Sequence, residues 1–490
     1  MNYRSFLSLA AMALVLITGT VTGPGCANIV PPQGGPKDTL PPVLRRVTPA
    51  DSSFKFNRDR IDFVFDEYID LDNAQQNLIM SPMPSSPPNI TRKLNTMSVR
   101  LRDTLEPNTT YSINFGNSIK DVNEGNIMRN YTYVFSTGTY FDSLQLSGKV
   151  ILAESGAIDT TLTVMLHRSA DDSAVYHQKP RYITRVDNTG SFRFRNLPPG
   201  VFYLYAIKSE GTYTYTNPET LFAFADSSII MGRHETPVTL YAYSLPKTQS
   251  AAPATGNAKP KPGDKRLKMT NKLQEGKQDL LTDFSLVFET PLRDFDTSKV
   301  HFSTDSTFTP LSGFNWSLDS SRKIASLRYP WKENTAYNLV IEKEFATDTL
   351  GQQLLKGDTL EFTSRKTADY GKVSLRFRNL DLSKNPVLLF FASSELKGSY
   401  PLTSVNFTQN LFMPGEYTLR ILEDRNKNGV WDPGAFFGKH VQPELVKPVE
   451  RKIVVKANWD NEAEIDILAP PAPAAGVPAG RPGVPPRGQR

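Results

Sequence analysis

The chain has 490 residues, of which 39% are hydrophobic and 10% aromatic, and it contains 37 prolines and 30 glycines. This length accommodates three or four domains of ordinary size, and the frequent turn formers favour small β domains in series. The net charge is +6, but the 56 lysines and arginines are mixed with 50 acidic residues. No basic stripe with interleaved aromatic residues runs through the sequence, so the composition argues against a nucleic-acid-binding protein.

The first 25 residues have the pattern of an export signal. Arg4 precedes an apolar run over residues 6–21, which is too short to cross a bilayer comfortably. Cys26 follows this segment and is the only cysteine, so the chain can form no internal disulfide. The position of Cys26 resembles that of the lipidated cysteine of bacterial lipoproteins. The alternative is an ordinary secretory signal with an incidental cysteine.

Residues 26–45 are rich in proline and glycine and predict a semi-extended tether. Over residues 46–140, bulky side chains alternate with polar ones, as in the runs 61–65 and 111–115, and no long helical period is present. Such alternation is typical of half-buried strands. The sequence therefore predicts an immunoglobulin-like β-sandwich over residues 46–140, which we call domain A.

Domain A has a second copy later in the chain. The sequence NTTYSI at 108–113 recurs as NTAYNL at 334–339, and FVFD at 63–66 recurs as LVFE at 286–289. The offset between the two sets of matches is nearly constant. We therefore predict a second sandwich, domain A′, over residues 267–366.

The segments that follow A and A′ also match each other, because each contains a Pro-Gly turn that leads into a strand, at 199–200 and at 414–415. They predict two smaller sandwiches, B and B′. The fold class is therefore all-β, with tandem β-sandwich domains in an A-B-A′-B′ duplication. The predicted boundaries are B over 141–246, an exposed linker over 247–266, B′ over 367–468 and a disordered Pro-rich tail over 469–490.

Several motifs are similar to those of a family of Bacteroidetes cell-envelope lipoproteins with an SbsA-type bacterial Ig-like domain. These motifs are GGPKDT at 34–39, FDE at 65–67, NTTY at 108–111, DVNEGN at 121–126 and FSTG at 135–138. The B segments resemble transthyretin-like, carboxypeptidase-regulatory sandwiches, which are accessory modules without an active site. The resemblance implies a location in the cell envelope and an architecture, but it supplies no settled activity.

Asp-Ser and Asp-Thr pairs followed by a small or aliphatic residue resemble the O-glycosylation acceptor of the same phylum. Such pairs are also ordinary turn formers. The candidate acceptor residues are Thr39, Thr104, Ser143, Thr160, Ser173, Thr349 and Thr359.

The clearest chemical motif lies in domain B′ at residues 424–432, where oxygen-bearing side chains alternate around a glycine. This is the spacing of a calcium loop, and it predicts a structural Ca²⁺. Position 12 of an EF-hand would be Ala435 instead of glutamate, so an EF-hand is not supported, and the missing ligand could come from Glu444 or from water. The alternative is a polar hairpin without metal. The candidate ligands are Asp424, Asn426, Asn428, the carbonyl of Val430, and Asp432.

The matching stretch of domain B, residues 208–218, lacks both carboxylates of the motif, so B should bind no calcium. Tyr213 and Tyr215 could instead offer a stacking surface for a sugar or a protein, although alternating tyrosines are more often half-buried packing residues.

Patterns for catalysis are weak. The five histidines are scattered singly, and Cys26 is assigned to the anchor. The pair Asp66-Glu67 alone is weak evidence for glycosidase chemistry, and its position suggests a structural role at the edge of the domain. We therefore expect no enzymatic activity.

Together these features predict a non-enzymatic cell-envelope lipoprotein that acts as a multidomain scaffold or binding protein, as an accessory of an outer-membrane protein complex. The rival hypothesis is a carbohydrate-binding or glycan-processing surface lipoprotein. The expected partners are the membrane, through the lipid anchor, and an envelope or outer-membrane protein, with no nucleic acid. Residues 27–32 lack the acidic cluster associated with surface export, which favours the periplasmic face of the outer membrane.

Overall fold

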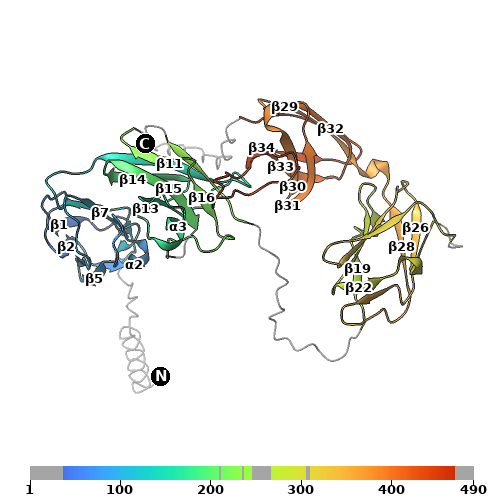
Figure 1. The fold of residues 1–490 in the computed structure, drawn as a ribbon, viewed down its shortest axis with the longest axis horizontal. Helices are drawn as coiled ribbons and strands as arrows, with labels where there is room; N and C mark the ends of the chain where they lie inside the picture. The colour runs from blue at the N-terminus through green and yellow to red at the C-terminus, as the bar shows by residue number, and fades with distance from the viewer. Residues whose placement is uncertain (1–36, 209–210, 234–236, 246–265, 305–308, 469–490) are drawn as a thin grey trace, which may run out of the picture. The chain divides into compact units, whose positions relative to one another are not determined.

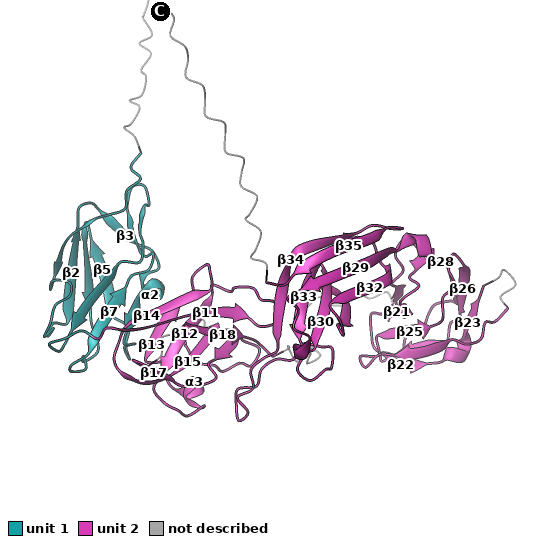
Figure 2. Ribbon diagram, turned by 90° about the horizontal axis from the view of Figure 1, so that it is seen from above, with its two compact units in different colours: residues 1–141 teal, residues 142–490 magenta. Residues whose placement is uncertain are grey.

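The computed structural model describes residues 37–208, 211–233, 237–245, 266–304 and 309–468. Within these ranges the chain is almost entirely β-structure, with two four-residue helices and short 3₁₀ turns between strands (Figure 1). Residues up to Phe141 belong to one compact unit and residues from Asp142 onward to a second (Figure 2). No helix in the described ranges is long and apolar enough to cross a membrane.

Domain A is a sandwich of two main sheets and a small third sheet. The strand orders are β1-β2-β6-β5, β10-β7-β4 and β3-β8-β9. The elements are β1 (Leu44–Thr48), β2 (Arg60–Phe65), β3 (Ile69–Leu71), α2 (Ala74–Asn77), β4 (Ile79–Ser81), β5 (Asn89–Lys93), β6 (Thr96–Arg100), β7 (Thr110–Asn114), β8 (Ile119–Asp121), β9 (Ile127–Met128) and β10 (Thr132–Ser136).

The core of domain A is built from the alternating residues that the sequence pattern indicated. In β2 the side chains of Ile61, Phe63 and Phe65 are buried, while the residues between them are half-buried. Phe63 makes edge contacts with Phe115, which follows β7, and with Tyr133 of β10, at ring-centroid distances of 5.3 and 5.4 Å. This interlocking of large rings from the two sheets closes the sandwich.

The strands of domain A′ that match those of domain A have the same order in their sheets. Its sheets run β19-β21-β25-β24, β20-β28-β26-β23 and β22-β27, so that β21, β25, β26 and β28 take the places of β2, β6, β7 and β10. The elements are β19 (Met269–Asn271), β20 (Lys277–Gln278), β21 (Phe284–Phe288), β22 (Leu292–Phe295), η1 (Thr297–Lys299), β23 (Val300–Ser303), β24 (Asn315–Leu318), β25 (Ile324–Arg328), β26 (Ala336–Ile341), β27 (Ala346–Asp348), β28 (Asp358–Ser364) and η2 (Thr367–Asp369).

A tyrosine corner explains why the NTTY sequence recurs as NTAY. The hydroxyls of Tyr111 and Tyr337 each accept a hydrogen bond from the backbone amide five residues upstream, at 2.9 and 3.1 Å. Asn108 and Asn334 both have φ of 49°, in the left-handed region that asparagine tolerates better than most residues. The repeat therefore encodes a turn and its tether in both copies.

Domain B is a smaller sandwich in which β11 pairs in parallel with β18 and antiparallel with β14. Its sheets run β14-β11-β18 and β13-β12-β15-β16, with β17 paired to β15. The elements are β11 (Leu144–Leu152), β12 (Leu162–His167), α3 (Ala174–His177), β13 (Tyr182–Arg185), β14 (Ser191–Leu197), β15 (Gly200–Lys208), β16 (Phe222–Phe224), β17 (Ile229–Met231) and β18 (Val238–Ala242).

Domain B′ repeats this arrangement. Its sheets run β32-β29-β35 and β31-β30-β33-β34, and β29 pairs in parallel with β35 as β11 does with β18. The elements are β29 (Gly371–Arg378), η3 (Leu382–Lys384), β30 (Pro386–Ala392), β31 (Glu395–Pro401), β32 (Asn406–Phe412), β33 (Gly415–Glu423), β34 (Leu445–Val455) and β35 (Asp460–Asp466).

The predicted all-β class, with tandem sandwiches in A-B-A′-B′ order, is confirmed by these sheets. Strand β1 begins at Leu44, inside the segment expected to be a tether, because Leu44 pairs with Phe65 at the edge of the first sheet. The signal peptide, Cys26, almost all of the expected linker and the whole expected tail lie outside the described residues.

Candidate functional site

The calcium-like motif lies in the connection between β33 and β34, over residues 424–444. Asp424 is 2% exposed, and its two carboxylate oxygens accept hydrogen bonds from Lys427 N and Gly429 N, both at 2.7 Å. Gly429 has φ of 76°, which a side chain would disfavour. The buried carboxylate therefore closes the turn by bonding to its backbone.

The other polar side chains of the motif gather at Asp432. Asn426 Nδ2 and Asn428 Nδ2 donate to Asp432 Oδ2, at 2.5 and 2.9 Å. The amide oxygens of the same two residues accept hydrogen bonds from Asn428 N and Val430 N, at 3.0 and 2.7 Å. The structure thus brings the predicted ligand residues into one turn.

Glu444 lies at the base of the same loop. It is 3% exposed, and its carboxylate accepts hydrogen bonds from Arg425 N at 2.7 Å and from Asp432 N at 3.2 Å. Its carbonyl accepts a hydrogen bond from Trp431 Nε1 at 2.8 Å. The residue that the sequence suggested as an additional ligand therefore holds the beginning and the end of the motif together.

The donor set suits a hard cation in its chemistry, because carboxylate, amide and carbonyl oxygens are the ligands that Ca²⁺ takes. A cation here would replace the amide N–H donors at Asp432, and the amides of Asn426 and Asn428 would have to turn their oxygens toward it. Among the described residues, no group of three or more His, Cys, Asp or Glu side chains is arranged to hold a metal ion. Calcium at this loop stays a prediction.

The tyrosines in the matching loop of domain B are packed against other rings. Tyr215 is 4% exposed and stacks on Phe222 with ring centroids 4.2 Å apart. Phe437, from the connection in B′, is another of its ring neighbours, at a centroid distance of 6.0 Å and an interplanar angle of 10°. Burial raises the pKa of Tyr215 to about 12. Tyr213 is half-buried, so Tyr215 offers no open face to a sugar and Tyr213 only part of one.

The second half of the B′ connection, residues 433–444, packs onto domain B. Phe436 is 4% exposed, and its ring centroid lies 5.5, 5.3 and 5.0 Å from those of Tyr205, Phe222 and Phe224. None of these three residues of B belongs to the core cluster inside that domain. The connection therefore covers a second apolar surface of B.

Polar contacts reinforce this packing. His440 Nε2 lies 2.7 Å from Asp172 Oδ2, next to helix α3, and Val446 N donates to Ala153 O at 2.8 Å. Domains B and B′ are therefore in contact although A′ lies between them in the sequence. This interface was not predicted from the sequence, where the adjacent aromatic pair Phe436-Phe437 in a connecting loop was the available signal.

The DVNEGN motif of domain A forms a turn around a buried carboxylate. Asp121 is 1% exposed and accepts hydrogen bonds from the amides of Glu124, Gly125 and Asn126, at 2.6, 2.7 and 2.9 Å. Burial alone would raise the pKa of Asp121, but these donors outweigh it and hold the pKa below its usual value. In A′, Asp348 likewise accepts from two backbone amides of the turn that follows it, at 2.9 and 2.8 Å.

The two carboxylates of the Asp66-Glu67 pair in domain A differ in their contacts. Asp66 Oδ1 accepts a hydrogen bond from Val43 N at 2.8 Å, and Asp66 Oδ2 lies 3.6 Å from an Arg45 guanidinium nitrogen. Asp66 thereby fastens the incoming chain to the first sheet. Glu67 has no comparable contact among the described residues.

All seven candidate O-glycosylation residues occupy exposed positions in the structure. Exposure is necessary for modification, and it does not distinguish acceptors from ordinary turn residues. The residues are Thr39, Thr104, Ser143, Thr160, Ser173, Thr349 and Thr359.

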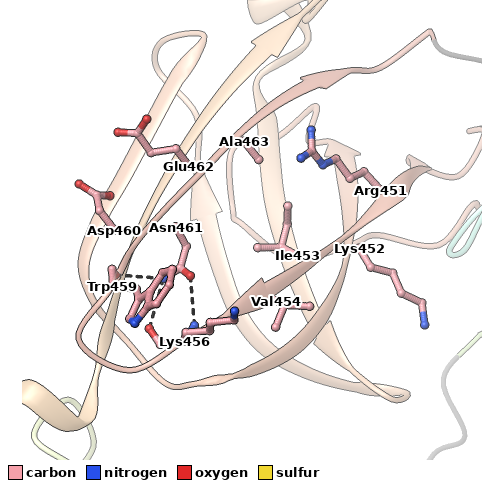
Figure 3. Close-up of a pocket in the computed structure, with 10 residues that line it drawn as sticks. All are labelled: Arg451, Lys452, Ile453, Val454, Lys456, Trp459, Asp460, Asn461, Glu462 and Ala463. Atoms are coloured by element: carbon pink, nitrogen blue, oxygen red, sulfur yellow. Dashed lines mark hydrogen bonds between the residues drawn. The ribbon is translucent and has the colours of Figure 1, made fainter.

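A shallow hollow of about 290 Å³ opens beside the turn between β34 and β35 (Figure 3). Trp459 at its rim is 62% exposed, and the Lys456 ammonium lies 4.8 Å from the centroid of its ring. Asn461 Nδ2 donates to Lys372 O and Trp459 O, both at 3.0 Å, and the Lys372 ammonium pairs with Asp460 at 2.5 Å. Asn461, Lys372 and Asp460 are thus already hydrogen-bonded within the domain, and the Trp459 indole is the exposed aromatic ring of the hollow.

Comparison with known families recognises one part of the chain. Residues 38–137 match the model of the bacterial Ig-like domain. The match covers domain A together with the residues that lead into β1. No curated protein matches the chain.

The solved structures that match the chain are distant. The TIE protein of Bacillus anthracis is 10% identical with a TM-score of 0.16, over 89% of this chain and 75% of that one. BcpA, the major pilin subunit of Bacillus cereus, is 10% identical with a TM-score of 0.17, over 66% and 98%. The N-terminal part of the bacterial S-layer protein SbsC is 15% identical with a TM-score of 0.16, over 42% and 44%. Similarity this distant says nothing about what the chain binds.

Proposed function

We propose that this protein is a non-enzymatic cell-envelope lipoprotein that serves as a multidomain scaffold for a partner in an outer-membrane protein complex. The observation that supports this best is the packing of B′ on B, in which the Phe436 ring is buried among three rings of B. Domains of one chain move independently unless an apolar interface joins them. The contact therefore favours a fixed spacing between B and B′, which a scaffold requires.

A pair of spin labels tests this rigidity. Arg195 in B and Glu450 in B′ are exposed positions, and both can be changed to cysteine in a chain that carries Cys26→Ser. We expect a narrow distance distribution that broadens in Phe436→Ala, because removing a buried ring costs about 3–5 kcal/mol of packing energy. Leu350→Ala, at an exposed site of A′, is the matched control. A broad distribution in the unaltered interface would contradict the scaffold.

The lipid anchor at Cys26, on the periplasmic face of the outer membrane, belongs to the same proposal. Its support is the sequence, in which the lone cysteine follows an export signal. A fatty-acid label should enter the wild-type chain and be absent from Cys26→Ser. Protease added to intact cells should leave the protein uncut. Labelling of Cys26→Ser would refute the anchor, and cleavage on intact cells would move the protein to the outer surface.

A structural Ca²⁺ at residues 424–432 is the proposed cofactor. A ligand that binds only the folded state stabilises it, by about 2.7 kcal/mol when its concentration is 100 times the dissociation constant. Chelation should therefore lower the melting temperature of the full wild-type chain. It should leave the melting temperature of the Asp424→Ala and Asp432→Ala variants unchanged. If the wild-type chain binds no metal and chelation leaves its melting curve unchanged, the calcium proposal fails and Asp424 and Asp432 are turn residues only.

O-glycosylation at the seven exposed Asp-Ser and Asp-Thr sites is the proposed modification. Glycopeptide mass spectrometry of the native protein tests it site by site. Unmodified peptides at all seven sites would remove it.

Carbohydrate binding is the second candidate function, and the exposed indole of Trp459 favours it, since sugars stack on open aromatic faces. Trp459→Ala should then abolish binding to an envelope glycan array. Equal binding by this variant, or no binding by the wild-type chain, would exclude the site. Tyr213→Ala is a suitable comparison, because Tyr213 is half-buried.

A further inference from the structure

Domain A has two ends, and the chain leaves for domain B at one of them. There the segment 52–56 is bonded to the segment 134–138 at the exit of β10. The opposite end is formed by the incoming chain at Val43 and by three turns. These turns are fastened together, because Ile69 N donates to Leu94 O at 3.2 Å and Val122 N donates to Tyr68 O at 3.1 Å.

Several exposed apolar side chains lie at this opposite end, and four of them, on the incoming chain and the three turns, form what we call the end surface of domain A. Val43 is 52% exposed, Tyr68 59%, Leu94 58% and Val122 51%. Single exposed apolar residues are ordinary on a protein surface, whereas a group of them on adjoining turns is a feature of interaction sites.

Carboxylates accompany these apolar groups. Glu67 is half-buried, and none of the described residues gives its carboxylate a hydrogen bond or an ion pair. Burial and the neighbouring charges of Asp121, Asp66, Asp38 and Glu124 raise the pKa of Glu67. A cation from outside the domain would relieve this repulsion.

The matched end of A′ has the same backbone and a different surface. Amide 349 donates to carbonyl 291 at 3.0 Å, and amide 292 to carbonyl 322 at 2.8 Å, as in A. Thr290 takes the place of Glu67 and donates to Asp348 Oδ2 at 2.7 Å. The matched residues, in A and then in A′, are Val43 and Lys268, Tyr68 and Pro291, Leu94 and Arg322, and Val122 and Thr349.

This comparison separates folding from binding. The A′ end folds in the same hydrogen-bond pattern with Lys268, Arg322 and Thr349 at three of the four positions, so the fold does not require apolar groups at those three positions. It also forms with a neutral hydroxyl in place of Glu67. The apolar groups and the unpaired acid of domain A therefore need a role other than holding the turns together.

We propose that the end surface of domain A docks a segment of a partner protein that carries lysine or arginine beside apolar side chains. The apolar residues of that segment cover Tyr68, Leu94 and Val122, and its cation pairs with Glu67. Charge complementarity selects a basic protein segment over a lipid surface, because anionic headgroups are repelled by the same carboxylates. The inference rests on the scaffold proposal and names the surface that the scaffold uses.

Site-specific photocrosslinking in the native envelope tests the assignment. The probe is p-benzoylphenylalanine, placed in the full chain at position 122, at the exposed Leu350 of A′, or at the exposed Trp459 of B′. We expect a protein adduct from position 122 alone, joined to a peptide with lysine or arginine. The yield should fall at least tenfold in the end-swap variant, Val43→Lys with Leu94→Arg, whose new residues are those of the matched A′ positions. It should also fall in Glu67→Thr.

Circular dichroism of the two variants confirms that they fold. A protein adduct from position 350 or 459 and none from position 122 would refute docking at the end surface, but it would be consistent with the scaffold function. The absence of a protein adduct at all three positions would count against both. Adducts from position 122 with lipid, or with a peptide that has no basic residue, would overturn the assigned partner chemistry.

Discussion

In domain A the buried carboxylate of Asp121 lies near the unpaired Glu67, whereas in A′ the matched Asp348 accepts a hydrogen bond from Thr290 at 2.7 Å. Both aspartates bond to the backbone amides of the turn that follows them. The duplicated unit has thus kept its internal bracing and changed the residue beside it. The hydrogen bonds of Asp121 and Asp348 that both copies share stabilise the common fold. The difference between Glu67 and Thr290 indicates where domain A has a function that A′ lacks.

Domains B and B′ also share their strand arrangement and differ in the packing of one loop, which follows β15 in B and β33 in B′. In B′ a small apolar cluster of Val387, Leu389, Leu422 and Val446 packs against Trp431 of its own connection. In B the ring of Tyr215 from the corresponding loop packs on Phe222, and the ring of Phe436 from B′ packs on Phe222 as well. The longer connection of the second copy serves both domains, which makes the two copies dependent on each other.

The largest effect is expected from removing the shared braces. Asp121→Ala and Asp348→Ala should each destabilise their own domain by about 2–3 kcal/mol, because buried amide donors lose their acceptor. The pKa of both carboxyls is held below 3.8, so this stability is present above about pH 4 and is lost as the pH falls further. Hydrogen exchange of peptides from each domain measures the loss. A strong effect in only one domain would show that the two turns are not equivalent.

Exchanging the residues that differ should have a smaller effect, of opposite sign in the two copies. Glu67→Thr should stabilise A by about 1 kcal/mol through a new hydrogen bond to Asp121, and Thr290→Glu should destabilise A′ by about the same amount.

The pH dependence of Glu67→Thr provides the control. The folded pKa of Glu67 lies above the usual 4.5, so the folded state binds its proton more tightly and wild-type stability falls as the pH rises through that window. The part of the stability gain of Glu67→Thr that comes from removing charge repulsion should therefore be complete at neutral pH. It should vanish below about pH 4, where Glu67 is protonated in wild type. A gain that is the same at both pH values would contradict repulsion at Glu67.

The smallest effect is expected at the tyrosine corners. Tyr111→Phe and Tyr337→Phe each remove one hydrogen bond to a backbone amide and should cost about 0.5–1 kcal/mol in their respective domains. Hydrogen exchange in the turns that contain Asn108 and Asn334 should rise equally in both. Unequal changes would weaken the case that the repeated NTTY and NTAY sequences have one structural purpose.

Much of the fold could be predicted because its signals are local. Alternation such as Ile61, Phe63 and Phe65 identifies strands, and a repeated Asn-Thr-x-Tyr turn reveals a duplicated domain. The Asp-Asn-Asn-Asp spacing at 424–432 placed these side chains in one turn for the same reason.

The interface around Phe436 and the end surface of domain A depend on residues far apart in the sequence. Phe436 and Phe222 are more than 200 residues apart in the sequence, and no local period records their contact. Glu67, Leu94 and Val122 come from separate turns, and each alone is an ordinary surface residue. They can be recognised as a candidate binding surface only when the matched positions of A′ are identified through the shared hydrogen bonds.

We propose that domain A contacts a partner through its end surface and that domain A′, whose matched end carries Lys268 and Arg322, does not. Affinity purification from membranes, with mass spectrometry, tests it most directly when wild type, the end-swap variant and an exposed A′ control, Leu350→Ser with Leu355→Ser, are compared. We predict a stoichiometric envelope protein with wild type and with the A′ control, and its loss with the end-swap variant. The same partner on all three chains, or no stoichiometric partner on any, would contradict the account.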